Sequence, residues 1–186
     1  MADFRHETER LVLRDWRSAD WPRFFAGTNT PAVMRWLGGV LDDAGRDATI
    51  GRVTGCAAAH GHCFWAAERK TDGEILGFCG LKRADAPGSS VTGEMEIGWR
   101  FRESAWGQGY AREAASAALT LGFERFGAGR IVALTVDGNT ASWGLMRRLG
   151  MIRDESLDYV DPRYGADLNP TIVYTIDRNG WQGHDG

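Results

Sequence analysis

The sequence predicts a mixed α/β fold in which helices cover the faces of one sheet. Three short apolar segments in the first half are joined by turn and loop signals, which is typical of an antiparallel meander. In the second half, helical periodicity alternates with apolar runs of strand length. The chain has 186 residues and is 43% hydrophobic, which suits one domain of ordinary size with its own core. We therefore expect the element order β-α-α-β-β-β-α-β-α-β-β.

The first half is expected to hold one strand, two helices and the meander. Ser18 is a favoured helix N-cap residue, and Gly61 follows the second helix where a terminal glycine is common. Asp72-Gly73 is a hairpin signal inside the meander, and residues 28–46 are typical of a loop with room for a short helix. In order, the predicted elements are a strand at 10–15, helices at 18–27 and 47–59, and strands at 62–68, 75–82 and 94–101.

The second half alternates helices and strands. Apolar side chains recur at helical intervals over residues 110–126, and Gly127 and Gly129 end that helix. Gly150 ends a second helix in the usual C-terminal position. In order, the predicted elements are a helix at 110–126, a strand at 130–136, a helix at 139–149, and strands at 151–160 and 171–177.

Composition argues against several classes of protein. The chain has 22 basic and 25 acidic residues, so it lacks the basic excess of a nucleic-acid-binding domain and no such partner is expected. No apolar run approaches the roughly 18 residues of a spanning helix, and the polar N-terminus does not resemble a signal peptide. Three cysteines at unpatterned spacing indicate reduced thiols in a cytoplasmic protein. Glycine, at 25 residues, indicates many places where the backbone turns or approaches another group.

One cluster has the residue types of a tetrahedral zinc site. Cys56, His60, His62 and Cys63 lie within eight residues of one another. Adjacent residues of a strand point to opposite faces, and the cluster has no standard finger spacing. We therefore expect a helix that runs into a buried strand, and no metal.

A glycine-rich turn between a strand and a helix has the pattern of an anion cradle. The strand at 94–101 is followed by Trp106-Gly107-Gln108-Gly109-Tyr110-Ala111. Alternate glycines let backbone N–H groups approach a phosphate, and the helix that follows adds the positive end of its dipole. The turn lacks the Gly-Lys-Ser/Thr of a nucleotide-hydrolysing loop, and Arg112 stands where a dinucleotide fingerprint has its third glycine. A tight turn without a ligand is the structural alternative.

A second motif, Asp137 to Met151, follows about thirty residues later. Together the two motifs resemble the GNAT family of acetyl-CoA-dependent N-acetyltransferases, and most closely its RimJ/RimL branch of ribosomal-protein alanine acetyltransferases. Residues 106–111 look like the family's pyrophosphate loop, residues 139–151 are similar to its second motif, and Thr8 to Arg14 is similar to the first strand of that branch. The resemblance covers residues 8–177 and implies a single acetyltransferase domain over residues 1–186.

The resemblance implies a mostly antiparallel sheet splayed between its fourth strand, 94–101, and its fifth, 130–136. The pantetheine arm of acetyl-CoA would lie in the gap and the pyrophosphate on the glycine-rich turn, without a metal. The residues expected to bind acetyl-CoA are Ile97, Trp99, Phe101, Arg102, Trp106, Gly107, Gln108, Gly109, Tyr110, Ala111, Arg112, Asn139 and Ser142. Arg102 and Arg112 are the guanidinium candidates for phosphate, with a solvated surface charge as the alternative for each. For Asn139 the alternative is a helix cap.

Catalysis in this family is direct attack of an amine on the acetyl thioester. Glu96 is the first candidate for the general base, because burial would raise the pKa of its carboxylate. Glu94 lies on the same face of the predicted strand and is the second, and a structural ion pair with arginine is the alternative for either. His60 and His62 are weaker candidates. Many members of the family have a tyrosine that acts as the general acid where this chain has Met146. The resemblance therefore assigns to Ser142 the proton for the leaving thiolate.

The acceptor is expected to be a primary amine. In this fold, substrate residues come from the segments 28–46 and 161–169, whose acidic and aromatic residues suit a cationic amine: Trp36, Asp42, Asp43, Asp161, Tyr164 and Asp167. A protein N-terminus, a polyamine and an aminoglycoside all remain open, as does a homodimer. An acyl-CoA-binding or regulatory module without catalysis is the alternative function, since the usual tyrosine is missing.

Overall fold

The computed structural model describes residues 4–181, which form two compact units. Unit 1 comprises the described residues up to Gly80 together with Trp99–Ala115, and unit 2 comprises Leu81–Gly98 together with the described residues from Ser116 onward. Strands β4 (Ile75–Arg83) and β5 (Met95–Phe101) and helix α4 (Tyr110–Glu124) each contribute residues to both units. The strand order β1-β2-β3-β4-β5-β6-β8-β7 confirms the predicted mixed sheet.

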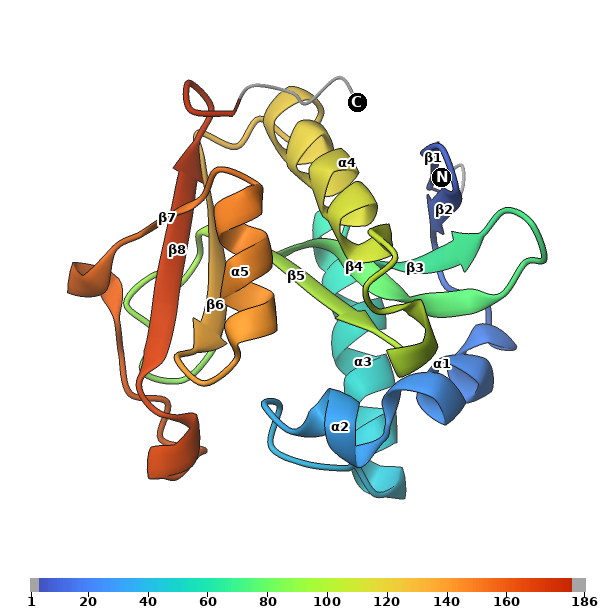
Figure 1. Cartoon of the computed structure of the whole chain (residues 1–186), viewed down its shortest axis with the longest axis horizontal. Helices are drawn as coiled ribbons and strands as arrows, with labels where there is room; N and C mark the ends of the chain where they lie inside the picture. The colour runs from blue at the N-terminus through green and yellow to red at the C-terminus, as the bar shows by residue number, and fades with distance from the viewer. Residues whose placement is uncertain (1–3, 182–186) are drawn as a thin grey trace. The chain divides into compact units, whose positions relative to one another are not determined.

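Unit 1 is an antiparallel sheet with an aromatic helical layer (Figure 1). Strand β1 pairs with β2, β2 with β3 and β3 with β4, and Trp65 lies opposite Cys79 in the β3–β4 register. Trp21, Phe24 and Phe25 of α1 pack with Val53 of α3 and Phe78 of β4 in one core cluster. Its remaining elements are β1 (Arg5–Glu7), β2 (Leu11–Arg14), α1 (Asp20–Thr28), α2 (Pro31–Met34), α3 (Asp43–His60), β3 (Phe64–Arg69) and the 3-10 helix η1 (Glu103–Ala105).

Unit 2 is built on the long pairing of β6 (Arg130–Val136) with β8 (Thr171–Asp177). These strands are antiparallel over their whole length, and β7 (Ile152–Arg153) adds a short edge to β8. Figure 1 shows α5 (Thr140–Arg148) alongside β6. The 3-10 helices η2 (Glu155–Leu157) and η3 (Ala166–Leu168) lie in the connection from β7 to β8. The strand β5 runs parallel to β6, with Met95, Glu96 and Ile97 opposite Ile131, Val132 and Ala133.

Glycines end several elements where the sequence predicted it. Gly61 follows α3 with a positive φ of 73°, and its N–H donates to the carbonyl of Ala57. Helix α4 ends at Glu124, two residues before the predicted bound at 126, and Gly127 follows with a φ of 68°. Gly150 has a φ of 83° directly after the C-cap of α5. The predicted bounds of the strands at 130–136 and 171–177 are also confirmed.

The start of α1 was predicted wrongly. The N-cap residue is Ala19 rather than Ser18, and no side chain caps the helix. The carboxylate of Asp20 instead accepts from the backbone N–H of Arg17 at 2.7 Å. Helix α3 also begins earlier than predicted, at Asp43, because the side chain of Asp42 accepts from the N–H of Gly45 and caps it.

The predicted strand at 151–160 shrinks to the two residues of β7. Asp154 ends it, because its carboxylate accepts from both the N–H and the hydroxyl of Ser156 and starts the 3-10 helix η2. Further along the chain, Tyr159 forms an isolated antiparallel β-bridge with Thr171. Strand β1 was not predicted. Within residues 4–181, no helix combines the length and the apolar character that crossing a membrane requires.

Candidate functional site

The glycine-rich turn of unit 1 connects η1 to α4 and is exposed. Gly107 and Gly109 have φ values of +70° and +82°, so both positions use the left-handed backbone region that favours glycine. The indole N–H of Trp106 donates to the carbonyl of Phe101 at 2.9 Å, while half of Trp106 stays exposed. The predicted strand–turn–helix geometry is therefore present, with an exposed backbone ahead of the first turn of α4.

A set of hydrogen bonds that was not predicted from the sequence holds this turn in place, and we call it the brace. Glu113, in the first turn of α4, accepts from the hydroxyl of Thr8 at 2.5 Å, from the N–H of Arg10 at 2.7 Å and from its Nε at 2.7 Å. The same guanidinium donates to the carbonyl of Gln108 at 2.8 Å and lies 4.4 Å from the ring centre of Tyr110. Burial alone would raise the pKa of Glu113, but these donors lower it. Because the partners are about one hundred residues apart, no local pattern could reveal the contact.

The two predicted phosphate arginines have different surroundings. Arg102 forms an ion pair with Glu74, and its guanidinium lies so close to Gly27 that a side chain at Gly27 would collide with it. Arg112 is exposed, and no residue among 4–181 forms an ion pair with it. In the unit 1 part of β5, Phe101 is buried and Trp99 is partly exposed.

The two candidate bases lie in unit 2 with different partners. Glu94 forms an ion pair with Arg130, whose Nε donates to Glu94 Oε2 at 2.7 Å. Within residues 4–181, Glu96 has no arginine partner of this kind: its Oε2 lies 3.2 Å from the ammonium of Lys82, without the geometry of a hydrogen bond. The arginine pair anticipated as the structural alternative is thus realised at Glu94. Glu94 also lies just before β5, which begins at Met95.

Burial controls the ionisation of Glu96. Its side chain is 12% exposed, and this burial raises the pKa of the carboxyl group above its ordinary value although Lys82 acts in the opposite direction. The direction agrees with the expectation for a general base. Ile97, next along the strand, is buried and stands opposite Ala133 at the last of the three β5–β6 pairs.

The second motif forms the start of α5 in unit 2. Asn139 is the N-cap, and its side-chain oxygen accepts from the N–H of Ser142 at 3.4 Å, so the capping alternative is realised. Ser142 is partly exposed, and its hydroxyl has no hydrogen-bond partner within residues 4–181. Met146 is buried in the core. Of the two positions, only Ser142 presents a proton donor.

Most of the carboxylates expected to attract an amine already have structural partners. Asp42 caps α3, and Asp43 forms an ion pair with Arg46. Asp161 is buried and holds the guanidinium of Arg163, with Nε at 2.9 Å from its Oδ1. Of the four, only Asp167 is without both a capping hydrogen bond and an ion pair among the described residues, and it is exposed. The prediction of an acidic substrate mouth therefore lacks support from three of its four carboxylates.

Within residues 4–181, no group of three or more side chains that could hold a metal ion comes together, and this includes the Cys/His cluster. Cys56 Sγ instead lies 3.6 Å from the carbonyl of His62, and the rings of His60 and His62 are 6.3 Å apart. His62 is buried and His60 exposed.

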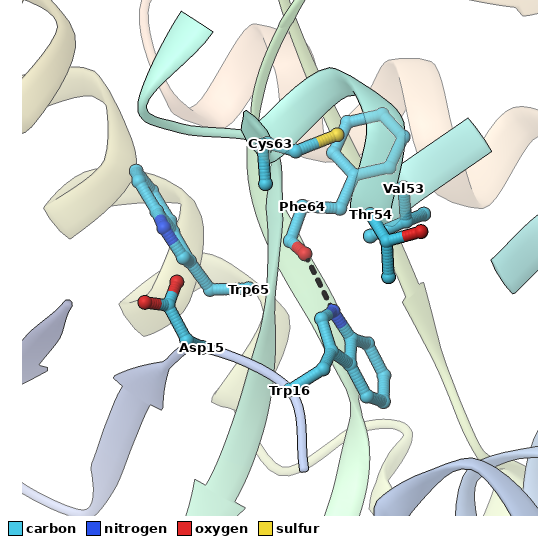
Figure 2. A pocket seen from close by; sticks show the side chains of 8 residues that line it. Asp15, Trp16, Val53, Thr54, Cys63, Phe64 and Trp65 are labelled. Atoms are coloured by element: carbon cyan, nitrogen blue, oxygen red, sulfur yellow. Dashed lines mark hydrogen bonds between the residues drawn. The ribbon is translucent and has the colours of Figure 1, made fainter. Parts of the chain in front are cut away.

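A pocket of about 160 Å³ lies in unit 1 (Figure 2). Its lining residues are Asp15, Trp16, Val53, Thr54, Ala57, Cys63, Phe64 and Trp65. The indole N–H of Trp16 donates to the carbonyl of Phe64 at 2.7 Å across it. No residue expected to bind acetyl-CoA or to act in catalysis lines this pocket, so it is not the predicted site.

Comparison with known families defines the class of protein. Residues 10–152 match the model of a family described as an acetyltransferase (GNAT) domain. The chain therefore belongs to the GNAT family of acetyltransferases, whose domains use acetyl-CoA. The resemblance inferred from residues 106–111 and 139–151 is confirmed at this level.

Individual relatives agree with the family. The Bacillus subtilis protein YnaD, described as an uncharacterized N-acetyltransferase, is 29% identical over 94% of this chain and 97% of its own length. The crystal structure of an acetyltransferase from Agrobacterium tumefaciens is similar with a TM-score of 0.80 and 25% identity, covering 96% of each chain. A ribosomal-protein-S5-alanine acetyltransferase from Vibrio fischeri, at 16% identity, has a TM-score of 0.70 over 97% of this chain and all of its own. At that identity the likeness shows the fold alone.

Proposed function

We propose that this protein is a single-domain, cytoplasmic N-acetyltransferase that transfers the acetyl group of acetyl-CoA to a primary amine. The acceptor is a protein N-terminus or a small-molecule amine. Family membership supports acetyl transfer, and the observation that carries the catalytic assignment is the contrast between the two carboxylates. Glu94 is neutralised by Arg130, whereas Glu96 is a buried carboxylate that no arginine of the described part of the chain holds in an ion pair.

The residues have separate roles in this proposal. The backbone N–H groups of 106–112 would hold the pyrophosphate, and Arg112 is the exposed guanidinium that can add to them. Backbone groups at Ile97, Trp99 and Phe101 of β5 would pair with the pantetheine arm, and a β5 backbone N–H would stabilise the oxyanion. Asn139 and Ser142 would face the thioester.

The chemistry is a direct transfer. Glu96 takes a proton from the ammonium form of the acceptor, directly or through water, which frees the nitrogen lone pair. The nitrogen attacks the thioester carbonyl carbon and a C–N bond forms. The C–S bond of the tetrahedral intermediate then breaks, the nitrogen loses its extra proton to solvent to give the neutral amide, and Glu96 releases its proton to solvent as well. Ser142 donates a proton to the departing thiolate and regains one from solvent, to which it is partly exposed.

A turnover assay with a panel of amines tests the activity. Free thiol should appear from acetyl-CoA only when an amine is present, and the product should gain the mass of one acetyl group. In parallel, acetyl-CoA and CoA should raise the melting temperature, whereas NAD and ATP should not. Stabilisation by CoA without thiol release on any amine would point to the non-catalytic acyl-CoA-binding module. Stabilisation by NAD but not by CoA would refute the proposal.

Loss of the brace on the glycine-rich turn should weaken cofactor binding. Arg10→Met removes the charged hydrogen bonds to Glu113 and Gln108, so the turn is less well ordered before acetyl-CoA binds. We expect the Kd of acetyl-CoA, measured by calorimetry, to rise about tenfold, which corresponds to the loss of one such bond. Arg5→Met is the matched control, because the ion pair of Arg5 among residues 4–181 is with the exposed Glu7 on the same hairpin. An equal Kd for both variants would show that the brace does not prepare the turn.

A further inference from the structure

A small charged cluster surrounds the carboxylate of Glu96 in unit 2. Lys82, near the end of β4, places its ammonium 3.2 Å from Glu96 Oε2, and both side chains are largely shielded, at 20% and 12% exposure. The same ammonium forms an ion pair with Asp85, whose side chain is 73% exposed. Lys82 is one of only two lysines in a chain that carries 22 basic residues. The Lys82 ammonium therefore interacts both with the buried carboxylate of Glu96 and with the solvated carboxylate of Asp85.

We propose that Lys82 is a positioning residue for Glu96: its ammonium keeps the buried carboxylate in the charged form that can accept a proton, and Asp85 moderates this effect by drawing the ammonium toward solvent. The inference rests on the proposed role of Glu96 as the general base. It assigns to β4 and to the segment after it a part in catalysis that neither motif contains.

The electrostatics of the cluster agree with this assignment. Burial raises the pKa of Glu96, the charge of Lys82 lowers it, and the charge of Asp85 raises it again. For Lys82, burial alone would lower the pKa, but Glu96 and Asp85 together raise it, so the ammonium stays charged. A lysine suits this place because its compact point charge can be divided between two carboxylates, whereas an arginine fork favours one.

Two further groups face Glu96 from the connection between β7 and β8. Arg163 also lowers the pKa of Glu96, but its guanidinium is held by Asp161, with Nη2 2.5 Å from Oδ2. Tyr159 is buried, and the Glu96 charge contributes to raising the pKa of its hydroxyl. Lys82 is thus the one cation within ion-pair distance of Glu96 among the described residues.

The test measures the ionisation of Glu96 in two independent ways. One is the acidic limb of the pH profile of kcat/KM, and the other is the carboxyl carbon NMR signal of Glu96, assigned by its absence in Glu96→Gln. Lys82→Met should move both toward higher pH by about one unit, since an opposite charge at this distance lowers a carboxyl pKa by about one to three units. Lys82→Arg should bring the acidic limb and the NMR titration most of the way back to their wild-type pH. Asp85→Asn should move both toward lower pH, because it removes a repelling charge and releases Lys82.

The outcomes separate this inference from the proposed function. If Glu96→Gln loses turnover but folded Lys82→Met titrates like wild type, the role of Lys82 is refuted and the base assignment stands. If Glu96→Gln keeps wild-type turnover, the base assignment fails, and with it the catalytic meaning of Lys82, even where the NMR signal shifts. Should Lys82→Met not fold, the exposed Asp85→Asn carries the test, and an upward or absent shift overturns the inference.

Discussion

Replacing Glu96 with glutamine is expected to lower kcat/KM for the amine by about 100- to 1000-fold at neutral pH. The amide keeps the size of the side chain but cannot accept a proton, so the acceptor must lose its proton to solvent before it attacks. Because Lys82 keeps its ion pair with Asp85, the loss of the Glu96 charge should not unfold the protein. Thiol release from acetyl-CoA measures the rate, and thermal unfolding confirms that the variant is folded.

Glu94→Gln is the informative companion of this variant. The two carboxylates are two residues apart, but Glu94 is committed to Arg130, so its loss should cost less than tenfold in kcat/KM. The acidic limb of the pH profile should disappear in Glu96→Gln and persist in Glu94→Gln. The reverse order of effects would transfer the role of base to Glu94.

Replacing Arg14 with methionine is expected to reduce the free energy of unfolding by about 3–5 kcal/mol, the usual cost of leaving a buried charge without its partner. Arg14 and Asp20 are each 4% exposed, and the guanidinium holds Asp20 through two bonds of 2.7 and 3.0 Å. It also donates to Glu68 at 2.6 Å. The variant leaves both carboxylates facing an apolar side chain, and urea unfolding measures the loss.

The free energy of unfolding that is lost in Arg14→Met should depend on pH in a defined direction. Burial alone would raise the pKa of Asp20, but the bonds from Arg14 and from the Arg17 backbone leave it below its ordinary value. A carboxyl group whose pKa is lowered by folding contributes stability at higher pH, and this is lost as the pH falls through its folded pKa. The gap between wild type and Arg14→Met should therefore be widest near neutral pH and narrow below about pH 4.

Arg5→Met provides the comparison for Arg14→Met. Its partner Glu7 lies one strand away from Arg14 and is exposed, so solvent screens the pair and the variant should unfold like wild type. If both arginine variants lost the same stability, the buried network would not be the cause.

Local chemistry accounts for the parts that could be predicted from sequence. Gly61 and Gly150 end their helices through a positive φ that needs no distant partner. The strands 130–136 and 171–177 are recognisable because each contains an apolar run of strand length. The turn of 106–111 and the start of α5 could be found for the same reason, since both depend on glycine and capping residues that are adjacent in the chain.

Contacts between residues far apart in sequence account for the rest. Ser18 has the chemistry of a cap, yet α1 begins at Asp20, which is held by Arg14, and Arg14 is itself bonded to Glu68, 54 residues further along the chain. Glu94 and Glu96 look equivalent in the sequence, and what separates them is Arg130 on β6 and Lys82 on β4. Sequence patterns recognise the backbone that we propose as the acetyl-CoA site, because its geometry is local. The protonation of a carboxylate depends on burial and on charges brought by other strands, so it becomes visible only when the chain is folded.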